Sequence, residues 1–181
     1  MQFSNEQIEQ IMQQTFAGLS LFYRDTNLSD EHLSVYKPGM ILRENGMTDA
    51  SYRGGGMITK HRFLIASAHA KNAAMFEHGT NWGLVILKPG SFFKVLDVFE
   101  SGGKTQITLL HVPDEGVDLF AQAKTNIEED IVEKTRKSFQ EKLAAPPVPE
   151  LTTEEWLGRT QHPVGLLADG SLQYSAAPKN G

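Results

Sequence analysis

The segment from Met57 to Val112 constrains the fold most, because short apolar runs alternate there with residues that favour turns. The apolar runs are rich in β-branched and aromatic residues and are too short for typical helices; they are residues 61–68, 81–88, 92–99 and 105–112. Pro89-Gly90 separates the second run from the third, and Ser101-Gly102-Gly103-Lys104 separates the third from the fourth. Both sequences favour tight reversals. The sequence therefore predicts an antiparallel meander of about four strands, roughly over residues 57–112.

A helical pattern precedes the predicted meander. Ser4 and Gln7 have the spacing of a capping box, and apolar residues then recur at every third or fourth position as far as Leu19. A second, short helix is predicted over residues 30–36, where a serine precedes two acidic residues. Residues 40–56 contain an Asn-Gly pair and three consecutive glycines, and we expect them to form a loop.

A longer helical pattern follows the meander. Asn126 is a suitable cap, and apolar residues line one side of the helix as far as Leu143. The sequence Pro-Pro-Val-Pro at residues 146–149 ends this helix and favours a stiff, extended connector. Beyond it we expect a short helix over residues 152–157 and a β-hairpin whose turn is Asp169-Gly170.

These patterns together predict an α+β fold, in which N-terminal and C-terminal helices flank the sheet. Residues 1–145 are expected to form the main domain, and residues 146–181 an arm made of the connector, the short helix and the hairpin. Because the arm is too short to bury a core of its own, it must dock on the main body or on a partner chain. The last residues of the chain are expected to fray.

Composition excludes several classes of function. The net charge of −5 and the isoelectric point near 5.7 disfavour a nucleic-acid-binding protein, which normally presents a basic face to phosphates. The chain has no cysteine, so disulfides and thiolate ligands are absent. No apolar run is long enough to span a membrane, and the acidic N-terminus does not resemble a signal peptide. We therefore expect a cytoplasmic protein.

Four histidines fall in or beside the predicted strands and raise the possibility of a metal site. His61 and His69 are eight residues apart, which on one extended strand is about 26 Å and excludes a shared ion. His69 and His78 converge only if the chain between them loops back. Because no zinc signature or carboxylate spacing accompanies them, we expect these histidines, His111 included, to be ordinary side chains rather than metal ligands.

Catalytic and cofactor motifs are equally weak. Ser67, His69 and Asp97 supply the residue types of a catalytic triad, but no Gly-x-Ser-x-Gly elbow accompanies them. The glycines after Arg53 precede a strand, whereas phosphate-binding loops lead from a strand into a helix, so we interpret residues 53–56 as a tightly bent or flexible connector. The sequence thus predicts no catalytic residues and no cofactor.

Two hypotheses about function remain. The preferred one is a non-catalytic module that binds a protein partner or associates with itself as a homodimer, because the arm carries many apolar residues; its partner-binding residues would be Trp156, Leu166, Leu167 and Tyr174. The alternative is a small enzyme or small-ligand-binding protein with a pocket at the strand ends, because ionisable and aromatic residues gather near flexible connections there; its ligand-binding residues would be Arg53, His69, His78 and Trp82.

Overall fold

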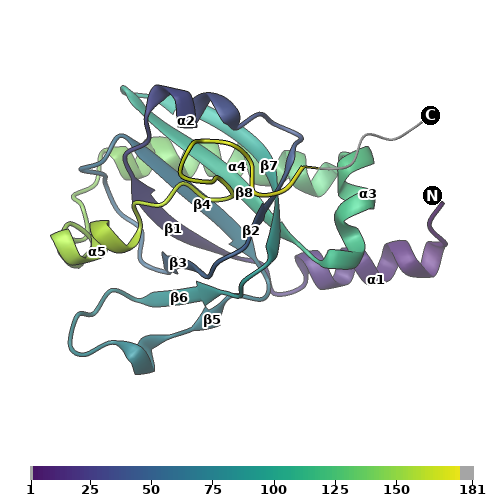
Figure 1. The fold of residues 1–181 in the computed structure, drawn as a ribbon, viewed down its shortest axis with the longest axis horizontal. Helices are drawn as coiled ribbons and strands as arrows, with labels where there is room; N and C mark the ends of the chain where they lie inside the picture. The colour runs from purple at the N-terminus through teal and green to yellow at the C-terminus, as the bar shows by residue number, and fades with distance from the viewer. Residues whose placement is uncertain (1, 176–181) are drawn as a thin grey trace.

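The computed structural model describes residues 2–175, which form an α+β fold around one eight-stranded sheet (Figure 1). The helices are α1 (Asn5–Phe16), α2 (Asp30–Val35), α3 (Val117–Gln122), α4 (Asn126–Leu143) and α5 (Glu154–Arg159), with 3-10 turns η1 (Ala74–Phe76), η2 (Asp114–Gly116) and η3 (Pro149–Leu151). The strands are β1 (Ser20–Thr26), β2 (Ile41–Glu44), β3 (Thr48–Ser51), β4 (His61–Ser67), β5 (Lys71–Asn72), β6 (Leu84–Leu87), β7 (Ser91–Ser101) and β8 (Lys104–Val112). The predicted fraying of residues 175–181 lies, except for Ser175, outside the described part.

The sheet is larger than the predicted four-strand meander and is connected differently. Its strand order is β2-β7-β8-β4-β1-β3-β6-β5, and all neighbours are antiparallel except β4 and β8, which are parallel. The tight reversal between Ser101 and Lys104 joins β7 to β8 as predicted. The predicted hairpin across Pro89-Gly90 is wrong, because β6 pairs with β3 and β5 whereas β7 pairs with β2 and β8.

The expectation of a loop over residues 40–56 is also wrong, because this region contributes β2 and β3. Each has only four residues, and β3 reads Thr-Asp-Ala-Ser, which has little intrinsic strand preference. The two strands form because β7 and β6 offer unpaired backbone groups along their edges. Pairing between distant segments, rather than local preference, decides their conformation.

The predicted helices are present with small shifts. Ser4 and Gln7 form the expected capping box at the start of α1, and α2 lies within the predicted range. The long helix α4 is capped by Thr125 and Glu128, one residue before the predicted cap at Asn126. Thr153 caps α5, where its hydroxyl accepts a hydrogen bond from the Trp156 backbone.

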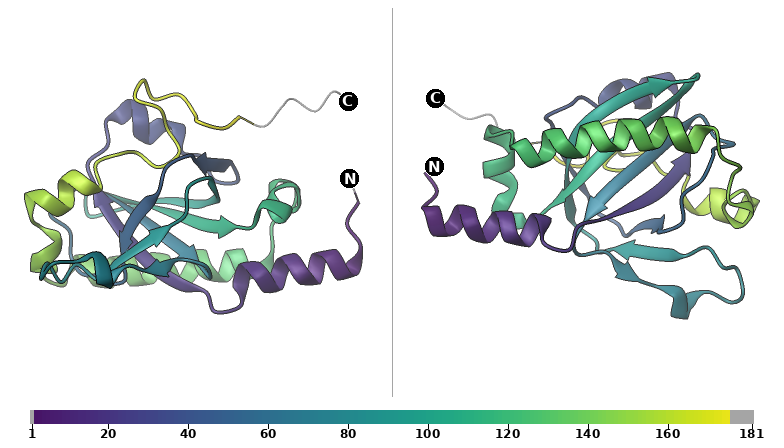
Figure 2. Two further views of the ribbon diagram at one scale, coloured as in Figure 1. Left: turned by 60° about the horizontal axis from the view of Figure 1, so that its bottom comes forward. Right: turned by 180° about the vertical axis from the view of Figure 1, so that it is seen from behind.

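Two apolar layers cover the faces of the sheet. Figure 2 shows α4 crossing one face, where α1 and α3 also contribute to a cluster around Leu110 and Phe120. The other face carries the largest cluster, with Phe63, Ile107 and Leu109 under α2 and under the chain from Thr160 to Tyr174. We call residues 160–174 the C-terminal segment. Because β8 is buried on both faces, it lies centrally, as its apolar residues at odd and even positions predict.

The arm docks on the body of its own chain. Gly56 forms a parallel bridge with Pro147 of the connector, and Trp156 packs against Trp82 with tilted rings whose centroids are 5.3 Å apart. The predicted hairpin around Asp169-Gly170 is reduced to a single antiparallel bridge between Leu166 and Leu172.

Candidate functional site

The carboxyl ends of β4 and β8 border a cleft of about 340 Å³, which we call the histidine cleft. It is lined by Gln14, His69, Lys71, Lys88, His111, Val112, Pro113, Asp114 and Glu115. Because β4 and β8 run in parallel, with Ala66 paired to Leu110, the next residue of each strand follows at the same edge of the sheet. Ser67 and His111 are these next residues, and the topology therefore brings them together.

Ser67 and His111 form a hydrogen-bonded pair at the base of the histidine cleft. The Ser67 Oγ atom lies 2.8 Å from His111 Nδ1 and also accepts a hydrogen bond of 3.0 Å from the backbone N–H of His69. Both side chains are buried, with 1% of Ser67 and 7% of His111 exposed. The His111 ring is further held by Phe93, whose centroid is 5.5 Å away.

His69 forms the outer part of the same cluster. Its Nε2 atom lies 2.7 Å from the carbonyl oxygen of Gln14 in α1, and its ring meets that of His111 edge to face at 6.0 Å. Since a carbonyl oxygen only accepts, His69 Nε2 carries the proton of this hydrogen bond. The first helix thus fixes the orientation of the exposed histidine relative to the buried one.

Electrostatics keep His111 neutral at physiological pH. Burial, and then the charges of His69 and Lys88, lower the pKa of His111 to about 4. The cleft itself carries charges of both signs, because Lys71 and Lys88 line it together with Asp114 and Glu115. A neutral, buried imidazole beside charged groups in a cleft is an arrangement typical of sites that bind or convert small molecules.

The predicted ligand-binding residues are distributed over two places. Arg53 and Trp82 lie near each other, since Arg53 donates a hydrogen bond of 2.7 Å to the carbonyl of Asn81 and Ser51 one of 2.6 Å to that of Trp82. Trp82 is buried, so it serves in packing. His69 lies instead in the histidine cleft, which is also lined by Lys88, just beyond the end of β6 that is far from Trp82.

The exposed His78 is in the loop between η1 and β6, and it does not line the histidine cleft. That loop is organised by Glu77, whose carboxylate accepts hydrogen bonds from the backbone of Trp82 and Leu84 and from the Thr80 hydroxyl. The sequence therefore indicates one lining residue, His69, but misses His111 and both lysines. The pairing of β4 with β8 places His111, and the pairing of β5 with β6 places the two lysines; no local pattern encodes either pairing.

The triad of Ser67, His69 and Asp97 does not assemble. Asp97 makes a two-point ion pair with Arg136 of α4, at 2.7 and 2.8 Å, and it does not line the histidine cleft. The partner of Ser67 is His111 rather than the side chain of His69. Among residues 2–175, no group of three or more histidine, aspartate or glutamate side chains is placed to hold a metal ion.

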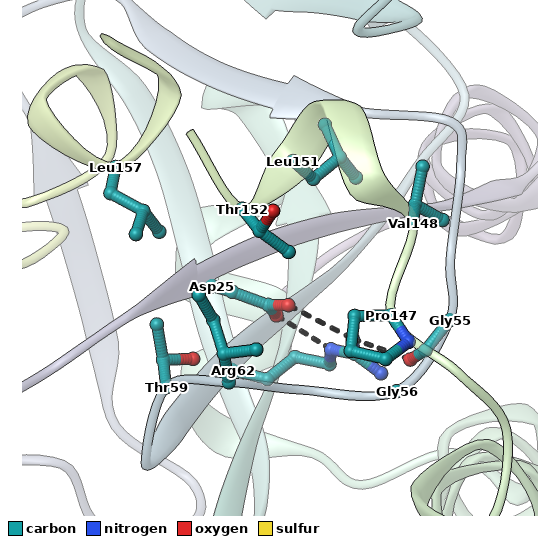
Figure 3. A pocket seen from close by; sticks show the side chains of 11 residues that line it. Asp25, Gly55, Gly56, Thr59, Arg62, Pro147, Val148, Leu151, Thr152 and Leu157 are labelled. Carbon is teal, nitrogen blue, oxygen red and sulfur yellow. Dashed lines mark hydrogen bonds and ion pairs between the residues drawn. The ribbon is translucent and has the colours of Figure 1, made fainter. Parts of the chain in front are cut away.

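The glycines after Arg53 permit close packing of two chain segments. A Cβ atom on Gly56 would lie 2.1 Å from the carbonyl oxygen of Ala145, and one on Gly54 would lie 2.4 Å from the Tyr23 ring. Beneath them, Arg62 pairs with Asp25 at 2.7 and 3.0 Å and donates to the carbonyl of Gly55 (Figure 3). The cavity beside this pair holds about 10 Å³, which is room for roughly one water molecule.

The predicted partner-binding residues lie mainly against their own chain. Trp156 and Leu166 are buried, with 1% and 0% of each exposed. Tyr174 packs edge to face on Phe92, with ring centroids 5.2 Å apart. Leu167 is the exception, since 48% of it is exposed.

A second set of buried charges lies under the C-terminal segment and is here called the Arg24 cluster; it consists of Arg24, Tyr36 and Glu44. Arg24 donates hydrogen bonds of 2.8 and 2.9 Å to the carbonyls of Asp49 and His162. Glu44 accepts from the backbone of Gly165 at 3.0 Å and lies 2.9 Å from His162 Nε2. Burial lowers the pKa of Arg24 to about 10, and burial also raises the pKa of Tyr36.

Another cleft of comparable size, about 380 Å³, lies beside α5. Its lining includes Thr26, Asn27, Gln161 and one titratable side chain, Glu154. It lacks the paired buried groups of the histidine cleft, which is therefore the better candidate site. None of the helices in the described residues is both long and apolar enough to cross a membrane.

Comparison with known proteins gives matches only among solved structures, since no family model and no curated protein matches the chain. The type III effector XopAI from Xanthomonas axonopodis pv. citri is 17% identical, with a TM-score of 0.46 over 52% of this chain and 44% of that one. The ADP-ribosyltransferase HopU1 of Pseudomonas syringae pv. tomato DC3000 is 13% identical, with a TM-score of 0.47 over 52% and 46%. C3stau2 from S. aureus with NAD is 15% identical, with a TM-score of 0.43 over 59% and 68%.

These matches cover about half of this chain, and the chain spans less than half the length of XopAI and HopU1. The expectation of a non-catalytic, protein-binding module is nevertheless corrected by them. HopU1 and Vis, which also matches, are named as ADP-ribosyltransferases, and such proteins are enzymes. The leaning away from an enzyme has no support from these neighbours either.

Proposed function

We propose that this chain is a small enzyme or small-ligand-binding protein whose site is the histidine cleft. The observation that carries the proposal is that a cleft of about 340 Å³ collects a buried imidazole, an exposed imidazole and two lysines at one edge of the sheet. Sites for small molecules are usually concave, with a few polar groups converging in them.

The chemistry available in the histidine cleft comes from His111 and its neighbours. His111 is held in place by Ser67 and Phe93, so that its ring has a fixed direction before any ligand binds. Lys71 and Lys88 provide positive charge on the lining, and Asp114 and Glu115 provide negative charge. Such a site suits a ligand with separated polar groups, and His111 is the residue placed to exchange a hydrogen bond or a proton with it.

A ligand-binding experiment tests the proposal. The intact chain, labelled with 15N, is screened by NMR against a fragment library and against NAD, which is included because C3stau2 was crystallised with it. We expect at least one ligand class to shift the signals of His69, His111 and Lys88 together, and we expect His111→Phe to abolish that binding. His78→Gln, which changes an exposed histidine outside the cleft, is the matched control and should bind normally.

Two results would overturn the proposal. One is a library in which no compound shifts the signals of the cleft residues. The other is a ligand that binds His111→Phe as tightly as the wild type, because that ligand would then occupy a different site. If NAD is the ligand that binds, assays for NAD hydrolysis and for ADP-ribosyl transfer decide between an enzyme and a binding protein.

A further inference from the structure

The hydroxyl group of Ser67 has two hydrogen-bond neighbours, and their chemistry determines which nitrogen of His111 carries the proton. The backbone N–H of His69 only donates, so Ser67 Oγ accepts that hydrogen bond. The second neighbour is His111 Nδ1, 2.8 Å away, which either donates or accepts. Among residues 2–175, the structure gives the Ser67 hydroxyl no other partner.

Only one assignment satisfies all of these groups. If His111 Nδ1 carried a proton, Ser67 Oγ would accept two hydrogen bonds and its own proton would be left unpaired in a site that is 1% exposed. An unpaired buried donor costs more than the hydrogen bond it fails to make. Ser67 therefore donates to His111 Nδ1, and the neutral ring carries its proton on Nε2.

The Nε2–H group of His111 has no hydrogen-bond partner in the described part of the chain, although 93% of the residue is buried and it lines the histidine cleft. A ring that presents one donor to a cleft suits a ligand with an acceptor atom at that point. Lys71 and Lys88, which line the same cleft, present ammonium groups that are also donors only. All three groups therefore match acceptor oxygen atoms, and the two ammonium groups favour oxygen atoms that carry negative charge.

We propose that the histidine cleft binds an oxyanion, a phosphate or carboxylate group, whose oxygen accepts a hydrogen bond from His111 Nε2 while Lys71 and Lys88 supply positive charge. This inference rests on the proposed function and names the ligand class for its site. Ser67 is a positioning residue in this scheme, because it holds the ring in the tautomer that donates into the cleft. Asp114 and Glu115 oppose a free anion, so the rest of the ligand is neutral or cationic where it passes them.

Histidine NMR on the intact chain tests both parts of this inference. The 15N shifts of His111 report its tautomer, and titrations with inorganic phosphate and with acetate report binding. We expect a protonated Nε2, and a saturable shift of that nitrogen with at least one of the two anions; the anion that binds identifies the phosphate or the carboxylate source. Asp114→Asn should tighten the binding about twofold, because it removes a repelling charge at the rim.

Variants of Ser67 distinguish a role in positioning His111 from a role in stability alone. Ser67→Ala should produce a mixture of His111 tautomers and weaken anion binding about fivefold, the loss expected for one hydrogen bond. Ser67→Thr keeps the hydroxyl and should retain most of the binding. His78→Gln should leave the His111 signals and the anion affinity unchanged.

Several outcomes would overturn the inference. A wild-type His111 protonated on Nδ1 contradicts the tautomer, and unaltered affinity in both Ser67→Ala and His111→Phe contradicts the site. If neither anion causes a saturable shift while a fragment occupies the cleft, the ligand class is wrong but the proposed function stands. If neither anions nor fragments enter the cleft, both proposals fail.

Discussion

The histidine cleft and the Arg24 cluster both contain buried ionisable groups, but the hydrogen-bonding atoms of these groups face different surroundings. In the Arg24 cluster, two guanidinium nitrogens, the carboxylate and the phenol are bonded to protein atoms, chiefly to the backbone of the C-terminal segment, and Arg24 Nε is enclosed without a partner among the described residues. In the histidine cleft, His111 Nδ1 is hydrogen-bonded to Ser67, and the other side of the ring faces the cleft. The first arrangement fastens a segment, whereas the second leaves a donor available.

This difference shows that a shifted pKa alone does not identify a functional site. The pKa values of both Arg24 and His111 are lowered, and burial is the largest cause in each case. What distinguishes the two is the destination of the hydrogen bonds. The Arg24 cluster stabilises the fold by closing the C-terminal segment over the sheet, and the histidine cleft has room for a ligand.

The largest expected effect concerns the C-terminal segment. Leu166 is fully buried in the main core, so Leu166→Ala should lower the free energy of unfolding by about 3 to 4 kcal/mol. Leu167, which is half exposed, is the matched control, and Leu167→Ala should change the free energy of unfolding by less than about 0.5 kcal/mol. Urea denaturation measures both values. Equal effects of the two substitutions would show that the segment is not docked as described here.

The next effect concerns the pH dependence that His111 confers on stability. Its pKa is about 4 in the folded chain against 6.5 for the free side chain, so the unfolded chain binds the proton more tightly. Above pH 6.5 this group therefore does not reduce the free energy of unfolding. As the pH falls toward 4, His111 lowers the free energy of unfolding by about 3 kcal/mol. His111→Gln should lack this part of the loss, and unfolding curves at several pH values measure the difference. Identical pH profiles for variant and wild type would contradict a buried, neutral His111.

The smallest effect is expected at Arg53, which lies outside both regions. Its guanidinium lies 3.1 Å from Glu150 in a partly exposed ion pair, and such pairs contribute little in water. Arg53→Gln should shift the melting temperature by less than about 3 °C, and it should leave ligand binding in the histidine cleft unchanged. Calorimetry measures the melting temperature, and the NMR titrations measure ligand binding. A loss of ligand binding in this variant would move the site toward Arg53 and Trp82.

The local signals in the sequence account for the helices and for one turn. Ser4 and Gln7 predict the start of α1 because a capping box depends only on residues three positions apart. The glycines at positions 102 and 103 have positive φ angles of 59° and 77°, which explains why the turn between β7 and β8 was predictable. Interactions of such short range depend only on neighbouring residues, so the sequence alone predicts them.

One strand shows how a small irregularity defeats such patterns. Simple alternation places Lys94 and Asp97 on opposite faces of β7, but both pair with side chains of α4, at Glu128 and Arg136. The reason is a β-bulge between Val95 and Asp97, which adds one residue to β7 and reverses the alternation after it. A bulge is set by the pairing of β7 with β8, so the sequence of β7 by itself does not reveal it.

By itself, the sequence determined the α+β class, the positions of the main helices and the presence of His69 near a strand end, because periodicity, caps and turns act over a few residues. Only the tertiary structure decided which strands are neighbours. The parallel pairing of β4 with β8 joins residues more than 40 positions apart and thereby places Ser67 beside His111. Such pairing depends on which exposed edges and apolar faces best satisfy one another across the whole chain, and this is why the candidate site emerged only from the folded molecule.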